Sequence, residues 1–134
     1  MTPDSIIDQM FANDPFSQWL GIQLLKKEKG SCSIQMTVRE EMCNGFGVTH
    51  GGITYSLADS ALAFASNSHG VKSMSIETSI SHTAPVRPGD ILTATPQEVS
   101  LKNKIAIYDI PVLNQDGLTV ALFKGTVYRS GKEW

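Results

Sequence analysis

The spacing of hydrophobic positions changes several times along the chain, and each change predicts a different element. Near the amino terminus, apolar side chains at helical spacing predict a short helix over residues 5–11, and residues 16–20 predict a further helical turn. From Ile22 the spacing becomes two residues, which is typical of strands. That strand and a second one over residues 32–38 form a predicted hairpin around the turn at 29–31.

A long, almost wholly apolar segment in the first half of the chain predicts a central helix. Residues 39–50 have no regular spacing of apolar side chains and predict a loop. The loop leads into a predicted helix over residues 52–67, and Gly70 is the residue that stops it. The strands expected after the helix cover residues 73–81, 90–101, 105–113 and 118–129. Pro111 predicts an edge position or a bulge in the strand over residues 105–113.

The first of these later strands alternates closely between apolar and polar side chains. Met74, Ile76, Thr78 and Ile80 share one face, and serines and Glu77 share the other. This pattern is typical of a sheet that is buried on one side and wet on the other.

The order of the elements predicts the fold class. Two strands, one helix and four strands include no repeated strand-helix-strand alternation, which argues against a doubly wound parallel sheet. Because the helix is apolar nearly all round, a curved antiparallel sheet wrapped around it is the economical way to bury it. We predict a single α+β domain over residues 1–134, a length that supports a substantial core.

Composition narrows the classes of partner. The net charge is −2 and the lysines are scattered, which disfavours nucleic acid or an anionic membrane as the main partner. No apolar segment approaches the roughly 20 residues that span a bilayer, and no signal peptide is evident, so we expect a cytoplasmic protein without a membrane partner. Cys32 and Cys43 match no zinc spacing, so we expect both to be reduced and predict no metal or other cofactor.

Asp59 is the only acid in the apolar helical segment. An ionised carboxylate there loses hydration, so it must be paired, protonated or used chemically. The start of the same helix offers a complementary group, because the Gly52 N–H is a candidate donor for a developing oxyanion or a carbonyl oxygen. Asp59 shares a face with Gly52 but lies roughly 10 Å further along the helix. Two antiparallel copies of the helix would bring the two groups together, which predicts a composite site at a twofold interface.

The segment Asn44–Gly52, followed by Ser56–Asp59, resembles the hotdog-fold acyl-CoA thioesterases, particularly the phenylacetate-degradation type. The shared features are a loop asparagine, a His-Gly-Gly turn and a helix aspartate in the same order and spacing. Residues 87–90 are also similar to that family's approach to a strand. The resemblance implies the hotdog fold and hydrolysis of a small, aromatic or medium-chain acyl-CoA to free acid and CoA. It also implies a homodimer, commonly a dimer of dimers, and no metal.

The resemblance also implies individual roles. Asp59 corresponds to the acid that serves as general base or nucleophile, and Gly52 to the N–H donor that polarises the thioester carbonyl. His50 and Asn44 match positions that support the loop and contact the substrate carbonyl or the attacking water. In place of the hydroxyl that related enzymes carry one turn after the acid, this chain has Ala63. The candidate substrate contacts are Gly51, Tyr55, Ser56, Ser60 and Arg87.

Two other interpretations stay open at the level of sequence. One is a hydrolase that uses Cys43 as nucleophile with His50 and Asp59 as a triad. The other is a non-catalytic acyl-CoA-binding or assembly subunit that keeps the pocket without the chemistry. A hydratase on the same fold lacks a matching motif in this chain.

Overall fold

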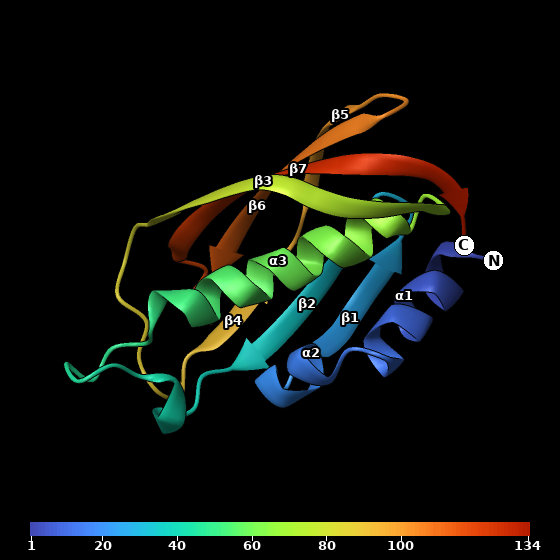
Figure 1. The fold of residues 1–134 in the computed structure, drawn as a ribbon. Coiled ribbons are helices and arrows are strands. Elements are labelled where there is room, and N and C mark those ends of the chain that lie inside the picture. Colours follow the sequence, from blue (N-terminus) through green and yellow to red (C-terminus); the bar gives the residue numbers. More distant parts are fainter.

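The computed structural model describes all 134 residues and centres on one 17-residue helix, α3, with a seven-stranded sheet curved around it (Figure 1). In chain order the elements are α1 (Pro3–Ala12), α2 (Pro15–Leu20), β1 (Gln23–Glu28), β2 (Ser31–Thr37), the 3-10 turn η1 (Glu40–Met42), α3 (Gly51–Asn67), β3 (Val71–His82), β4 (Ile91–Ala94), β5 (Gln97–Leu101), β6 (Ile105–Leu113) and β7 (Thr119–Glu133). The predicted central helix is confirmed, with its start one residue earlier.

All strand pairs are antiparallel, in the order β1-β2-β4-β6-β7-β3, and β5 also pairs with β6. β3 therefore pairs with β7 on one side and has a free edge on the other. Figure 1 shows β3 running along α3 at this edge of the sheet. None of the helices is long and apolar enough to cross a membrane.

The core lies between α3 and the inner face of the sheet. Leu57, Leu62 and Phe64 of the helix are at most 1% exposed. At Gly125 of β7 the helix and the sheet approach so closely that an added Cβ would lie 2.4 Å from a methyl carbon of Leu62. The opposite face of the helix is not covered by the sheet. The half-buried side chains on this face are small or polar: Ser56, Asp59, Ser60 and Ala63. This face therefore exposes little apolar area, and the helix needs burial by the sheet on one side only.

The prediction of a single strand over residues 90–101 is wrong. This run forms two strands, β4 and β5, with Pro96 between them, because proline has no N–H to donate to a strand ladder. β6 pairs with β5 as far as Asp109 and with β4 from Val112 onward. Pro111 therefore lies in an interior strand, but opposite the break between the two partners, where the sheet is locally open.

The prediction that β3 buries one complete face is also wrong in its first half. Met74 is 69% exposed and Ile76 is 58% exposed. The register between β3 and β7 shifts between Ser75 and Glu77, and nothing in the chain covers the outer edge of β3. The apolar residues of this strand are consequently available at the surface.

Candidate active site

Asp59 lies on the uncovered face of α3, with its carboxylate half-buried. No hydrogen bond or ion pair within the chain engages this carboxylate. Its pKa is raised above the ordinary value for aspartate, first by loss of hydration and second by the negative charge of Asp14. An unpaired carboxylate with a raised pKa has the properties of a general base.

Two serines place Asp14 near the site. Asp14 caps α2 by accepting from the backbone N–H of Ser17 at 2.9 Å and from the Ser17 hydroxyl at 2.5 Å. The Ser17 oxygen also lies 2.8 Å from the hydroxyl oxygen of Ser60, the residue after Asp59. Asp14 directly before Pro15 is typical of a helix start. Its influence on the pKa of Asp59 follows only from the contact between α2 and α3.

Asp59 opens onto a cavity of about 250 Å³ between α1, α3, β3 and β7. Its apolar lining comes from Met10, Leu62, Ala63, Met74 and Val127, and its polar lining from Ser66, Asn67, Ser73 and Ser75. Neither the contribution of α1 nor that of β3 to this cavity was predicted, since both depend on how distant segments pack.

The start of α3 presents backbone donors, as predicted. The N–H groups of Gly51 and Gly52 have no acceptor within the chain. The space where a Cβ on Gly52 would lie is open, whereas a Cβ on Gly51 would lie 2.9 Å from Nε2 of His82. His82, which no sequence pattern singles out, therefore covers one side of this turn, and Gly52 is the more accessible of the two glycines.

The loop before α3 is organised by its own hydrogen bonds. Oδ1 of Asn44 accepts from the Phe46 N–H at 2.8 Å, and the Asn44 N–H donates to the Val48 carbonyl at 2.8 Å. Asn44 is thus a turn residue whose side-chain NH₂ has no partner. His50 occupies the N-cap position of α3, with an exposed side chain that makes no capping hydrogen bond.

The predicted donor and acid do not meet within one chain. A cavity of about 410 Å³ at the helix start includes Thr49, Gly51 and His82 in its lining, but not Asp59. None of the five cavities is lined by Asp59 together with either glycine. The physical reason is the separation of about two helical turns, roughly 10 Å, along one rigid helix.

Several candidate substrate contacts already have partners within the chain. The hydroxyl of Tyr55 bonds to that of Thr78, and the Ser56 hydroxyl donates to the Gly52 carbonyl at 2.7 Å. Ser60 bonds to Ser17, as described above. By contrast, Arg87 is exposed and makes no side-chain hydrogen bond, while its backbone N–H donates to Asp90 at 2.9 Å.

The geometry does not assemble a Cys43 triad. The Cys43 thiol lies 3.8 Å from the Arg39 carbonyl oxygen, and no hydrogen bond joins it to His50 or Asp59. Both cysteines are free, as predicted, and burial raises the pKa of Cys32 to about 12. The structure contains no group of three or more His, Cys, Asp or Glu side chains that could hold a metal ion.

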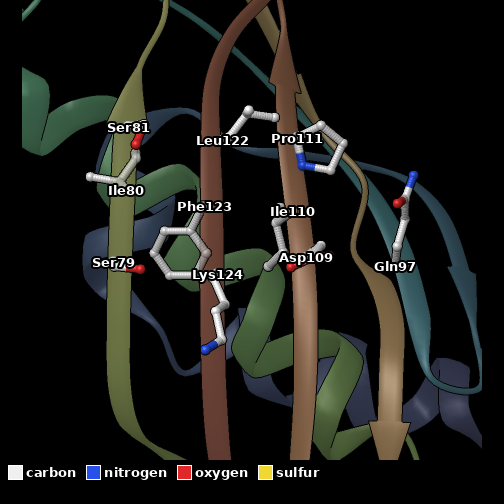
Figure 2. A pocket seen from close by; sticks show the side chains of 10 residues that line it. All are labelled: Ser79, Ile80, Ser81, Gln97, Asp109, Ile110, Pro111, Leu122, Phe123 and Lys124. Atoms are coloured by element: carbon white, nitrogen blue, oxygen red, sulfur yellow. The ribbon is translucent and has the colours of Figure 1, made fainter.

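The largest cavity, about 430 Å³, lies on the sheet and not beside these residues (Figure 2). Figure 2 shows Leu122 and Pro111 near one end of it, with Asp109 and Lys124 further along the same two strands. It contains neither an unpaired helix donor nor Asp59, so we do not assign the reaction to it.

Comparison with known proteins identifies the class. Residues 46–121 match the Thioesterase superfamily. Acyl-coenzyme A thioesterase PaaI of Escherichia coli K12 is 39% identical over 122 residues, which cover 91% of this chain and 87% of that protein. The solved structure of the E. coli PaaI protein from the phenylacetic acid degradation operon has a TM-score of 0.95 at 37% identity, covering 98% of this chain and 95% of that one. The structure of smu.793 from Streptococcus mutans UA159 bound to acetyl CoA has a TM-score of 0.81 at 26% identity, covering 84% and 91%.

The chain therefore belongs to the thioesterase superfamily. Within that superfamily it is similar to PaaI along almost its whole length. The predicted hotdog fold is confirmed, and so is the prediction of a thioester hydrolase.

Proposed function

We propose that this enzyme hydrolyses an acyl-CoA to the free acid and CoA, in sites that two copies of the chain complete together. The observation that carries the proposal is the unpaired, half-buried carboxylate of Asp59 on the uncovered face of α3, together with free N–H donors at the start of the same helix. A relative named as an acyl-CoA thioesterase and a similar structure bound to acetyl CoA support the choice of substrate class.

The partner in the proposed site is a second copy of the chain. β3 is a 12-residue edge strand that exposes Met74 and Ile76, and an unprotected apolar edge of this length favours pairing with another strand. A twofold contact along β3 sets the two α3 helices antiparallel, with Asp59 of each copy approaching Gly52 of the other. Pairs of such dimers form the larger assembly that the family resemblance implies.

The chemistry uses protein groups only. Asp59 removes a proton from a water molecule while the water oxygen attacks the thioester carbonyl carbon. The Gly52 N–H of the other copy stabilises the negative charge on the carbonyl oxygen. The C–S bond then breaks, and the departing thiolate of CoA takes up the proton. In the alternative route Asp59 attacks the carbonyl itself, and water hydrolyses the resulting anhydride. A covalent acyl group on Asp59, detected by mass spectrometry after rapid quenching, would assign this second route.

Three further residues have proposed supporting roles. The side-chain NH₂ of Asn44, which has no partner in the chain, orients the carbonyl or the water, and His50 supports the same loop. Arg87 follows Val86, and the Val86 carbonyl accepts from the Thr49 N–H in the loop before α3 at 2.7 Å. The exposed guanidinium of Arg87 is therefore placed near this loop to contact a CoA phosphate.

A panel of acyl-CoAs tests this proposal, with release of free CoA thiol as the readout. We expect the wild-type chain to release thiol from several of them, and Asp59→Asn to lose about 10²- to 10⁴-fold in kcat, as removal of a general base does. The matched variant Cys43→Ser is expected to keep full activity. Near-normal turnover by Asp59→Asn, or loss of turnover in Cys43→Ser, would contradict the proposed roles.

A further inference from the structure

Two residues that line the cavity beside Asp59 lie outside the residues matched to the family. The match covers residues 46–121, whereas Met10 belongs to α1 near the amino terminus and Val127 to β7. Met10 and Asp59 nevertheless line the same cavity, with Met74 of β3 also in its lining. A segment that the family match does not include therefore shapes the space next to the reactive carboxylate.

Apart from the Asp59 carboxylate and the Ser75 hydroxyl, which make no hydrogen bond within the chain, the polar side chains of this cavity are already engaged. The side-chain NH₂ of Asn67 donates to the carbonyls of Ala63 and Ser73 at 2.8 and 3.1 Å, and its oxygen accepts from the Ser73 N–H and from Trp134. The Ser66 hydroxyl donates to the Ala63 carbonyl at 3.3 Å. No Lys or Arg lines the cavity. Its chemistry fits an uncharged, largely hydrocarbon group.

α1 is fixed in position, so its wall of the cavity is a stable feature. Ile6 and Ile7 are at most 1% exposed, and the ring of Phe11 packs edge-on against Phe64 of α3 with centroids 6.3 Å apart. The side chain of Gln18 on α2 donates to two carbonyls at the end of α1. Within this fixed frame the long, unbranched side chain of a methionine is the part that adapts.

We propose that Met10 determines acyl specificity, by limiting the length of an acyl group that lies in this cavity. The inference rests on the proposed thioesterase site. At about 30 Å³ for each water-sized unit, a volume of 250 Å³ holds an acyl group of about eight non-hydrogen atoms. The preferred substrates are uncharged acyl groups of this size, and a charged acyl terminus finds no cation here.

The test is a profile of kcat/KM against chain length, for straight-chain acyl-CoAs from butyryl to dodecanoyl. Met10→Ala removes three non-hydrogen atoms from the wall, so the ratio of kcat/KM for decanoyl- to hexanoyl-CoA should rise about tenfold or more. Met10→Phe narrows the cavity and should lower that ratio. Gln9→Ala, on the exposed side of the same helix, is the matched control and should leave the profile of the wild type.

The outcomes separate this inference from the function on which it rests. An unchanged length profile in a folded Met10 variant, with hydrolysis intact and Asp59→Asn inactive, overturns the role of Met10 alone. Thiol release from none of the acyl-CoAs by the wild type overturns the proposed function instead. Circular dichroism identifies which variants fold. Because Met10→Ala and Met10→Phe are expected to shift the ratio of kcat/KM for decanoyl- to hexanoyl-CoA in opposite directions, one folded variant is enough to test the role of Met10.

Discussion

Ser17 of α2 and Ser60 of α3 lie with their hydroxyl oxygens 2.8 Å apart, and this contact anchors the start of α2 beside the site. Since the Ser17 hydroxyl donates to Asp14, Ser60 is the donor in the contact between the serines. Asp14 thereby becomes a fixed negative charge whose influence reaches Asp59. The proposed catalytic acid and its electrostatic neighbour come from different elements and are 45 positions apart in the chain.

Asp14→Asn should move the acid limb of the pH profile of kcat/KM to lower pH. Asparagine still caps a helix, so α2 is preserved while the negative charge is removed. Without that charge the pKa of Asp59 falls, although loss of hydration, the larger cause, still holds it above its usual value. The base form of Asp59 then persists to lower pH. A pH profile of Asp14→Asn that coincides with the wild type would show that the two carboxylates do not interact.

Asp59→Asn should stabilise the fold at neutral pH while removing activity. Folding raises the pKa of Asp59, so the folded state is favoured when this group is protonated and loses stability as the pH rises through the folded pKa. The asparagine amide does not titrate, so the variant avoids that loss of stability. The melting temperature of Asp59→Asn should exceed that of the wild type at pH 7. The difference between the two melting temperatures should shrink below the ordinary aspartate pKa of about 3.9. A lower melting temperature at pH 7 would mean that the carboxylate has a stabilising partner.

Gly52→Ala should lower activity without lowering stability. Its Cβ meets no atom of the chain, and alanine favours a helix over glycine by about 0.5–1 kcal/mol. The same Cβ obstructs the approach of a substrate carbonyl to the N–H. Gly51→Ala gives the contrast, because its Cβ would lie 2.9 Å from Nε2 of His82, whose exposed side chain must shift to make room. Denaturant unfolding and thiol release measure both effects, and full activity in Gly52→Ala would speak against the assigned donor.

Gly125→Ala should destabilise the fold by about 1–3 kcal/mol, because the new Cβ would lie 2.4 Å from a Leu62 methyl carbon in a packed core. Leu62→Ala removes the obstructing atoms, although it also lowers the free energy of unfolding by itself. In a chain that carries Leu62→Ala, adding Gly125→Ala should therefore lower the free energy of unfolding much less than it does in the wild type. A double-mutant cycle from denaturant unfolding measures the difference. Additive effects of the two substitutions would place the strain elsewhere.

Local patterns predicted the elements that depend on neighbouring residues. The apolar run before Asn67 predicted the end of α3, and the acid at position 59 was identified because no other charge lies in that run. The same reasoning could not place the split at Pro96 in space, since the effect of a proline depends on which strand lies beside it. It also assigned Met74 to a buried face, because alternation shows which residues share a side but not whether anything covers it.

The site shows the same division. The order of Asn44, His50, Gly52 and Asp59 along the chain was enough to predict a donor at the helix start and an acid further along. The proximity of Asp14 and Met10 was beyond prediction, because both reach the site through the packing of α1 and α2, and no local pattern encodes that packing.

Subunit complementation tests the central claim most directly. Asp59→Asn removes the acid, and Gly52→Pro removes the N–H in the first turn of the helix, where proline is tolerated. Each variant alone should be nearly inactive. In mixed dimers, formed by refolding the two variants together, one site combines Asp59 of one chain with Gly52 of the other. Because half of the dimers in an equal mixture are mixed and each has one intact site, about a quarter of wild-type activity should return. No recovery in dimers shown by native mass spectrometry to be mixed would contradict a site shared between subunits.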